Sequence, residues 1–379
     1  MFPAGAGEVG GEINRGDEPW WSAARLQAVE QREYVSRASA TYQFGDALLR
    51  IDANDPPLVE GFARRYGDCA VSPASVADVP GVRLTMQRSF DPQMIVLTFQ
   101  EGAPPDPAGV AYNLLRPTHA VPPFRVWDAP LPAWRLAGGT TGPVLAACGA
   151  RVLMHPKLVP QEFLVEYLVG ITLGTQPSML PIHGASLRIG EAGAVLVGAS
   201  RAGKTTTSLH LAARGHALLG DEIALIRIAT GEIVPFRRAV NLRPGPYRED
   251  LARELGLPPA DQSESAAAEA DSVPHRITEL FPRQPAHPAP LRAVFFLAGF
   301  ADRASVEPFQ LTLGHEDIFA WITTPEIAYC SWGMAPARRA LRLLALKQTL
   351  SRIPCWLVKV GPPRDTVQVI ERTMEELAC

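Results

Sequence analysis

The sequence predicts an α/β protein in which a smaller, mostly β N-terminal domain precedes a larger domain of alternating strands and helices. Before residue 150, short apolar runs are separated by Gly and Pro, the pattern of a unit built from several short strands. After residue 150, strand-like and helix-like patterns alternate, which is typical of an α/β domain. A length of 379 residues also favours two domains. We therefore expect a disordered lead-in over 1–17, the N-terminal domain over 18–150 and the second domain over 151–379.

The N-terminal domain contains one segment that alternates cleanly between apolar and polar residues, at 81–87. Such alternation predicts a strand with one buried face. Less regular apolar runs predict further strands at 42–51, 94–99 and 109–115. The segment 57–66 is the clearest helix candidate, because it begins with Pro at the first helical position.

The second domain is predicted to begin with a helix at 161–173, where apolar residues recur near helical spacing. A long apolar segment at 217–228 is interrupted by two acids and is expected to be a buried strand. The segment 257–290 is rich in Pro, Ala, Ser and Glu, which predicts a mobile loop or lid. The other expected strands are 186–189, 194–197, 291–297 and 355–360, and the other expected helices are 204–214, 336–350 and 365–377.

Composition excludes several classes of protein. Lys and Arg number 36 against 39 Asp and Glu, a net charge of −3, which argues against a nucleic-acid partner. The first 21 residues lack both a basic start and an apolar run, so we do not expect them to be a secretory signal. The uncharged run 167–187 is broken by Gln and Pro, which argues against a membrane-spanning helix. The five cysteines are scattered without a CxxC pair, so we expect free thiols in a soluble, cytoplasmic protein with no membrane partner.

The strongest motif is the segment 198–205, which reads Gly-Ala-Ser-Arg-Ala-Gly-Lys-Thr and fits the pattern G-x-x-x-x-G-K-[ST]. An apolar strand candidate precedes this segment and a helix candidate follows it, as a phosphate-binding loop (P-loop, or Walker A motif) requires. Backbone amides of such a loop surround phosphate oxygens, and the helix dipole adds positive charge. Lys204 would reach the β- and γ-phosphates, and the Thr205 hydroxyl would bind Mg²⁺. The candidate nucleotide-binding residues are Gly198, Ala199, Ser200, Arg201, Ala202, Gly203, Lys204, Thr205 and Thr206.

Two adjacent acids, Asp221 and Glu222, lie within an apolar segment downstream of the loop. Placing acids near a core is unfavourable unless a cation meets them, and nucleotide-bound Mg²⁺ is the simplest partner. The alternative is a strand-end turn with solvated carboxylates. His183 lies before the two strands that lead to the loop and is either structural or catalytic, whereas we interpret His216 as structural, at a helix C-terminus.

These motifs together resemble the HPr kinase/phosphorylase family of bacterial serine kinases. The resemblance runs from His183-Gly184 through the loop 198–205 and Arg214-Gly-His216 to Asp221-Glu222. It implies a P-loop kinase domain of HPr kinase type that uses ATP and Mg²⁺, and it allows for a homo-oligomer. By the same resemblance, Asp221 is the general base, Glu222 lies at the metal with Thr205, and His183 and Lys204 belong to the catalytic site.

The sequence departs from that family in three ways. The second acid is Glu222 rather than Asp, Arg201 replaces a Gly of the loop, and a Glu-Ile-Arg-Gly segment has no counterpart. The chain is therefore more similar to divergent kinases of the group, some of which resemble enzymes that modify peptide natural products. HPr itself and the reverse phosphorolysis reaction are not expected from these residues.

The function that these observations predict is ATP-dependent, Mg²⁺-assisted phosphoryl transfer to a serine or similar hydroxyl of a peptide or protein. Two alternatives stay open: a small-molecule kinase on the same scaffold, and a nucleotide-binding ATPase switch. A further cation beside the transferred phosphoryl group would be useful, and Arg237, Arg238 and Arg243 are the nearest candidates downstream.

Overall fold

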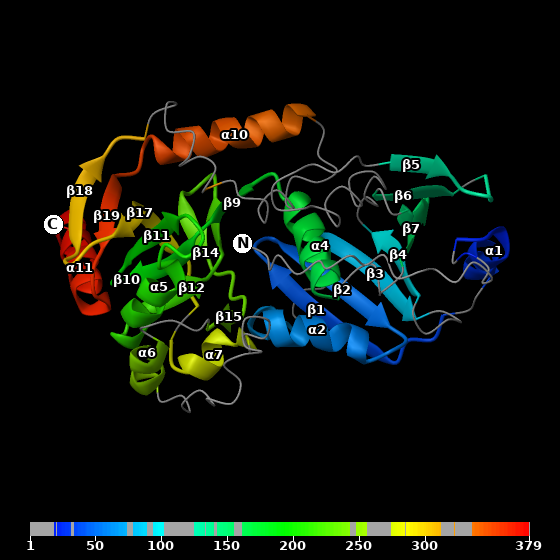
Figure 1. Cartoon of the computed structure of the whole chain (residues 1–379), viewed down its shortest axis with the longest axis horizontal. Helices are drawn as coiled ribbons and strands as arrows, with labels where there is room; N and C mark the ends of the chain where they lie inside the picture. Colours follow the sequence, from blue (N-terminus) through cyan, green and yellow to red (C-terminus); the bar gives the residue numbers. More distant parts are fainter. Residues whose placement is uncertain are drawn as a thin grey trace. The chain divides into compact units, whose positions relative to one another are not determined.

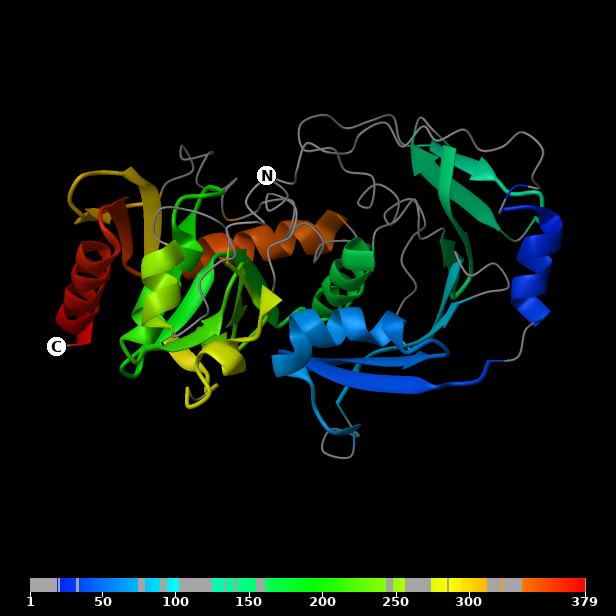
Figure 2. The ribbon, with the colours of Figure 1, turned by 60° about the horizontal axis from the view of Figure 1, so that its bottom comes forward.

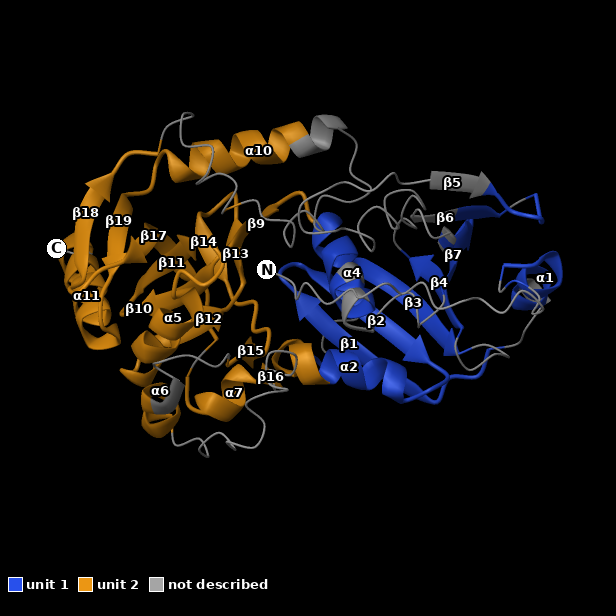
Figure 3. Ribbon diagram, viewed as in Figure 1, with its two compact units in different colours: residues 1–63, 70–175, 329–333 blue, residues 64–69, 176–328, 334–379 orange. Residues whose placement is uncertain are grey.

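A computed structural model describes most of the chain, which divides into two compact units (Figure 3). The described residues are 19, 21–31, 34–73, 79–88, 94–101, 125–132, 134–139, 142–154, 161–242, 248–255, 274–284, 286–311, 322 and 336–378. The predicted lead-in 1–17, the predicted strand 109–115 and Arg243 lie outside these residues. Unit 1 comprises 1–63, 70–175 and 329–333, and unit 2 comprises 64–69, 176–328 and 334–379.

Unit 1 is built on one eight-stranded sheet with the strand order β1-β2-β3-β4-β8-β7-β6-β5. Only β2 and β3 are parallel among its neighbouring pairs, and such a pair needs a crossover connection, which includes helix α2 (Pro57–Tyr66). The strands are β1 (Ala38–Phe44), β2 (Ala47–Ala53), β3 (Gly81–Arg88), β4 (Ile95–Glu101), β5 (Arg125–Asp128), β6 (Arg135–Gly139), β7 (Gly142–Cys148) and β8 (Arg151–Met154). Helix α1 (Ala23–Gln31) precedes them.

Two predictions for this part of the chain need correction. The run 42–51 is a hairpin rather than one strand, because Gly45 adopts a φ of 64° in the turn between β1 and β2. The predicted domain boundary at 150 also differs from the division between the units. Strand β8 pairs with β4 and β7, and helix α4 (Gln161–Gly174) packs on β1, β2 and β3, so both belong to unit 1.

Unit 2 contains a nine-stranded mixed sheet with the order β12-β10-β11-β17-β14-β13-β9, to which β19 adds beside β17 and β18 beside β19. The β11–β17 and β17–β19 pairs are parallel. The strands are β9 (Met179–His183), β10 (Ala185–Ile189), β11 (Ala192–Gly198), β12 (Ala217–Gly220), β13 (Ile223–Arg227), β14 (Glu232–Val234), β17 (Ala289–Phe300), β18 (Ser305–Phe309) and β19 (Cys355–Val360). A small separate ladder joins β15 (Val240–Asn241) to β16 (Pro274–His275).

Helices cover both faces of the unit 2 sheet (Figures 1 and 2). On one face, α5 (Lys204–Ala213) and α11 (Pro363–Ala378) pack on the sheet together with α6 (Arg248–Glu254) and α7 (Ile277–Leu280). On the other face lies α10 (Pro336–Leu350). Strand β11 is apolar on both sides because its residues alternate between these two cores, as expected of a strand between helical layers. The architecture is therefore mixed α/β, as predicted.

Two predicted elements of unit 2 are different in the structure. The segment 217–228 forms two strands, because the chain turns at Asp221-Glu222 and then pairs with β9 and β14 instead of β10. The end of the predicted mobile loop, 274–290, contains β16, α7 and the start of β17, with Ile277 fully buried. Residues 257–273 of that loop lie outside the described part. None of the described helices is long and apolar enough to cross a membrane.

Candidate functional site

The loop 198–205 connects the end of β11 to the start of α5. Two of its glycines are needed for physical reasons. A Cβ on Gly198 would lie 3.0 Å from the carbonyl oxygen of Leu297 on the neighbouring strand, a contact tighter than most side chains make, which favours Gly at this position. Gly203 has a φ of 94°, a conformation that side chains disfavour, directly before the first residue of α5. The loop therefore packs closely against β17 where it leaves β11. At its other end it is followed by the first turn of α5, whose backbone N–H groups have no acceptor within the helix.

Lys204 folds back over this loop. Its ammonium Nζ donates hydrogen bonds to the carbonyl oxygens of Gly198 (2.9 Å) and Ala199 (3.0 Å). The positive charge is thus held at the loop, where an anion would meet it together with the helix N-terminus. The other predicted nucleotide-binding residues lie in the loop or in the first turn of α5: Ser200, Arg201, Ala202, Thr205 and Thr206. Arg201 adopts a φ of 66°, which is unusual for a residue with a side chain.

In the structure, Asp221 lies beside Thr205 at the end of the loop 198–205. The Thr205 hydroxyl lies 3.0 Å and 3.2 Å from the two carboxylate oxygens of Asp221 and donates to this group. Asp221 is only 3% exposed. Burial, and next the negative charge of Glu222, raise the pKa of Asp221 to about 6, while the Thr205 hydrogen bond acts in the opposite direction. A buried carboxyl of this kind can exchange a proton near neutral pH.

Glu222 adopts an unusual backbone conformation directly after Asp221. Its φ is 68°, and the N–H of Ile223 donates to the carbonyl of Asp221 (2.9 Å), which are features of a strained γ-turn. The Glu222 carboxylate lies 3.4 Å from the guanidinium Nη1 of Arg238. Positive φ at a residue other than Gly costs about 1–2 kcal/mol, and such conformations concentrate at functional sites. The turn therefore points the two acids to different partners.

His183, the last residue of β9, contacts the turn at Asp221-Glu222. Its Nδ1 lies 2.9 Å from the carbonyl oxygen of Glu222, and because a carbonyl only accepts, Nδ1 carries the proton. The N–H of Gly184 donates to the same carbonyl (3.1 Å). A Cβ on Gly184 would lie 2.6 Å from the carbonyl oxygen of Leu196, so Gly is required there. Burial, and next the positive charge of Lys204, lower the pKa of His183 to about 4, so the imidazole is neutral at neutral pH.

The structure separates the downstream arginines, which the sequence alone did not distinguish. Arg238 forms an ion pair with Glu222, and its positive charge also lowers the pKa values of Asp221 and His183. Arg237 instead donates from Nη2 to the carbonyl of Gln284 (3.1 Å) and lies near Asp68 and Cys69. Two neighbouring residues of the same type thus face different surroundings, and Arg238 is the one at the acids.

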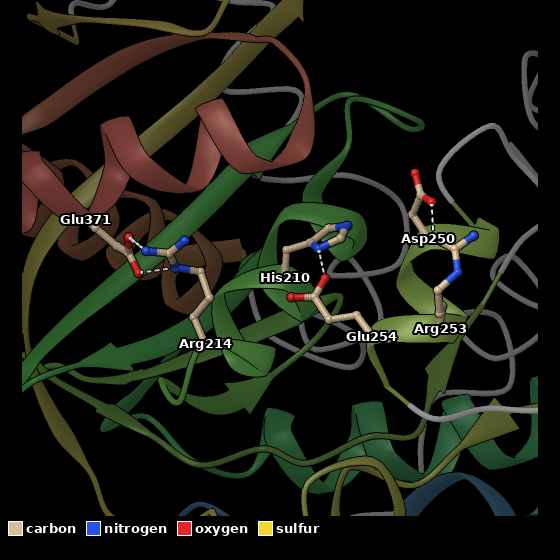
Figure 4. Close-up of polar contacts among 6 residues, drawn as sticks. All are labelled: His210, Arg214, Asp250, Arg253, Glu254 and Glu371. Carbon is tan, nitrogen blue, oxygen red and sulfur yellow. Dashed lines mark hydrogen bonds and ion pairs between the residues drawn. The ribbon is translucent and has the colours of Figure 1, made fainter.

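Away from the loop, polar side chains of α5 tie it to other helices (Figure 4). Arg214 and His216, which follow α5, both contact the Glu371 carboxylate of α11, at 2.8–2.9 Å. This geometry agrees with a structural role for His216. A second link, in which His210 Nδ1 lies 2.7 Å from Glu254 of α6, was not predicted from the sequence. His210 and Glu254 are 44 positions apart in the sequence, so no periodic pattern could predict their contact.

The side chains that could hold Mg²⁺ are oxygen donors. They are the Thr205 hydroxyl and the carboxylates of Asp221 and Glu222. Oxygen ligands suit Mg²⁺, which usually takes one or two carboxylates and completes its coordination with phosphates and water. No cluster of three or more His, Cys, Asp or Glu side chains capable of holding a metal occurs among the described residues. The donor set therefore fits a nucleotide-dependent metal better than a metal bound by the protein alone.

The described cysteines are not among the residues assigned to the candidate site. Cys69, Cys148 and Cys355 are free thiols, as predicted. Burial raises the pKa of Cys69 to about 12 and that of Cys355 to about 11, so both are protonated at neutral pH.

Comparison with known proteins gives little similarity. No protein-family model matches the chain, and no curated protein has a significantly similar sequence. Among solved structures, the Hpr(Ser) kinase/phosphatase from Coxiella burnetii matches 52% of this chain and 88% of its own chain, with 14% sequence identity and a TM-score of 0.24.

Proposed function

We propose that this chain is an ATP-dependent, Mg²⁺-assisted kinase of HPr kinase type that phosphorylates a serine or similar hydroxyl of a peptide or protein. The observation that carries the proposal is the hydrogen bond between Thr205 and Asp221 (3.0 Å). It joins the phosphate-loop motif to a buried carboxyl whose pKa is raised to about 6. A phosphate-binding loop beside a carboxyl that can take up a proton is the arrangement that phosphoryl transfer to a hydroxyl needs.

In this mechanism the residues of the site have separate roles. The loop amides and Lys204 bind the phosphates and offset their charge. Asp221, ionised above its pKa of about 6, accepts the proton of the acceptor hydroxyl. The hydroxyl oxygen bonds to the γ-phosphorus, the bond from that phosphorus to the β–γ bridging oxygen breaks, and ADP leaves. Thr205 and Glu222 would hold Mg²⁺, which neutralises charge on the phosphates when it is bound.

His183 and Arg238 position the two acids. The Nδ1–H of His183 fixes the carbonyl of Glu222 and with it the turn that carries both carboxylates. Arg238 balances the charge of Glu222 and favours the ionised form of Asp221. Because His183 is neutral, it adds no further positive charge beside Lys204.

The test is phosphoryl transfer by the full chain with ATP and Mg²⁺, followed by intact-mass analysis and phosphorus NMR. Acceptors would be serine-containing peptides, an HPr-like protein, and small alcohols and sugars. We expect transfer to a peptide or protein hydroxyl, and a loss of roughly 10²–10⁴-fold in Asp221→Asn because the base is removed. The matched control is Asp250→Asn, which changes an exposed carboxyl on α6 and should leave the rate unchanged.

The alternatives give different outcomes in the same experiment. Transfer to small alcohols or sugars, but not to peptides or proteins, would indicate a small-molecule kinase. Release of ADP without any acceptor, equally fast in Asp221→Asn, would contradict the kinase proposal and favour an ATPase switch.

A further inference from the structure

We propose that Phe300 is a stacking platform for the base of the nucleotide whose phosphates occupy the loop 198–205. The inference rests on the phosphate site proposed above, to which it adds a base-binding surface. Phe300 is the last residue of β17 and is 66% exposed, although burying an aromatic ring is normally favourable.

Phe300 lies directly beside the loop. A Cβ added to Gly203 would be 3.8 Å from Cε1 of Phe300 and 3.6 Å from Cγ1 of Val360. The residues that meet here come from the carboxyl ends of β11, β17 and β19, which are parallel neighbours. In sheets with parallel strands, ligands bind at the carboxyl ends of these strands.

A β-bulge gives the ring this position. In β17, Ala293, Phe295 and Leu297 face the core that contains α5, whereas Val294 and Phe296 face the opposite core. Strict alternation would place residue 300 with the latter group. The register shifts between Leu297 and Phe300, where Gly299 has a φ of 113°, and the ring of Phe300 comes to lie next to Gly203, the residue directly before α5. Bulges that redirect a side chain are frequent beside active sites.

The strand order places the acids and Phe300 on opposite sides of the loop. The strands lie in the spatial order β12-β10-β11-β17. Asp221 follows β12, whereas Phe300 ends β17, on the other side of β11. A nucleotide whose γ-phosphate faces Asp221 therefore has its base on the β17 side. There the ring of Phe300 offers a planar, apolar surface to a planar base.

Stacking on an aromatic ring tolerates any base, because every base has a π-face. The platform therefore contributes affinity for ATP and GTP alike and none for an inorganic polyphosphate. This difference separates the base site from the phosphate site.

The experiment is a calorimetric titration of the full chain with the Mg²⁺ complexes of ATP, GTP and inorganic tripolyphosphate. We expect Phe300→Ala to weaken ATP and GTP binding by about tenfold and to leave tripolyphosphate binding within about twofold. Phe300→Tyr, which keeps the ring, should bind all three as the wild type does. The matched control is Leu341→Ala, which removes a side chain that is 64% exposed on α10 and should have no effect.

The outcomes distinguish the platform from the phosphate site. If Phe300→Ala binds ATP as tightly as the wild type, or loses ATP and tripolyphosphate equally, Phe300 is not a base platform, and the phosphate site stands. If the wild type binds neither ATP nor tripolyphosphate, or if Lys204→Ala binds both unchanged, the phosphate site itself is wrong and the platform with it.

Discussion

The burial of the Asp221 carboxyl affects both the stability of the fold and the pH at which this group can take up a proton. The carboxyl has a pKa of about 6 in the folded protein, above the ordinary value of 3.8. The folded state therefore binds the proton more tightly than the unfolded state, so this group favours folding below pH 4 and loses that contribution as the pH rises to about 6. At neutral pH the ionised form in a buried position is unfavourable for folding.

We therefore expect Asp221→Asn to be more stable than the wild type at pH 7–8, because the amide keeps the hydrogen bond to Thr205 without a buried charge. The advantage should shrink as the pH falls from about 6 to 4, where Asp221 becomes protonated. Urea unfolding at several pH values would measure this. A wild type more stable than the variant at pH 7–8 would contradict the raised pKa. His183 titrates in the same range with the opposite sign, so the variant must be compared with the wild type at each pH.

At the scale of elements, α5 depends on its contacts with α11 as much as on the loop before it. The carboxylate of Glu371, which is only 16% exposed, accepts from both Arg214 and His216 at the end of α5. Cationic groups at a helix C-terminus also interact favourably with the helix dipole. Together these contacts hold the helix whose first turn bears Lys204 and Thr205.

Glu371→Gln should lower the free energy of unfolding by about 1–3 kcal/mol, because two charge-assisted hydrogen bonds are weakened. Nucleotide affinity should stay close to that of the wild type, since Glu371 does not contact the loop. Glu375→Gln, on an exposed position of the same helix, is the control and should change stability by less than about 0.5 kcal/mol. Chemical unfolding measures both variants, and equal stabilities would show that the link to α11 contributes nothing.

At the scale of the whole molecule, every residue assigned to the candidate site belongs to unit 2. Its sheet places β11 between β10 and β17 and has helices on both faces, so the loop sits on a scaffold with two cores. Unit 1 has its own eight-stranded sheet, and none of the residues that we assign to the candidate site belongs to it.

We expect ATP with Mg²⁺ to slow amide hydrogen exchange in 198–207 and at the end of β17, because a ligand stabilises the state that it binds. Exchange in the paired strands β1–β4 of unit 1 should not change. Mass spectrometry of exchanged peptides would show the pattern, with Lys204→Ala as the control that abolishes it. Protection confined to unit 1 would place the nucleotide elsewhere.

Local patterns in the sequence were enough to predict the strand before the segment 198–205 and the helix after it. The mixed α/β architecture also follows from local patterns, because alternation and helical spacing reflect which face of each element is buried. Where a turn interrupts an apolar run, as at Gly45 and Asp221-Glu222, the same patterns failed, because two strands joined by a short turn read as one apolar run whether or not they pair with each other.

Only the tertiary structure decided which distant side chains meet. In the structure the Thr205 hydroxyl donates to Asp221, and Arg238 rather than Arg237 contacts Glu222. Helix α4 belongs to unit 1. A bulge that alternation does not predict turns Phe300 toward the loop. The physical reason is that sequence periodicity records burial along one element, whereas pairing between elements depends on strand order and register, which are set by packing across the whole sheet.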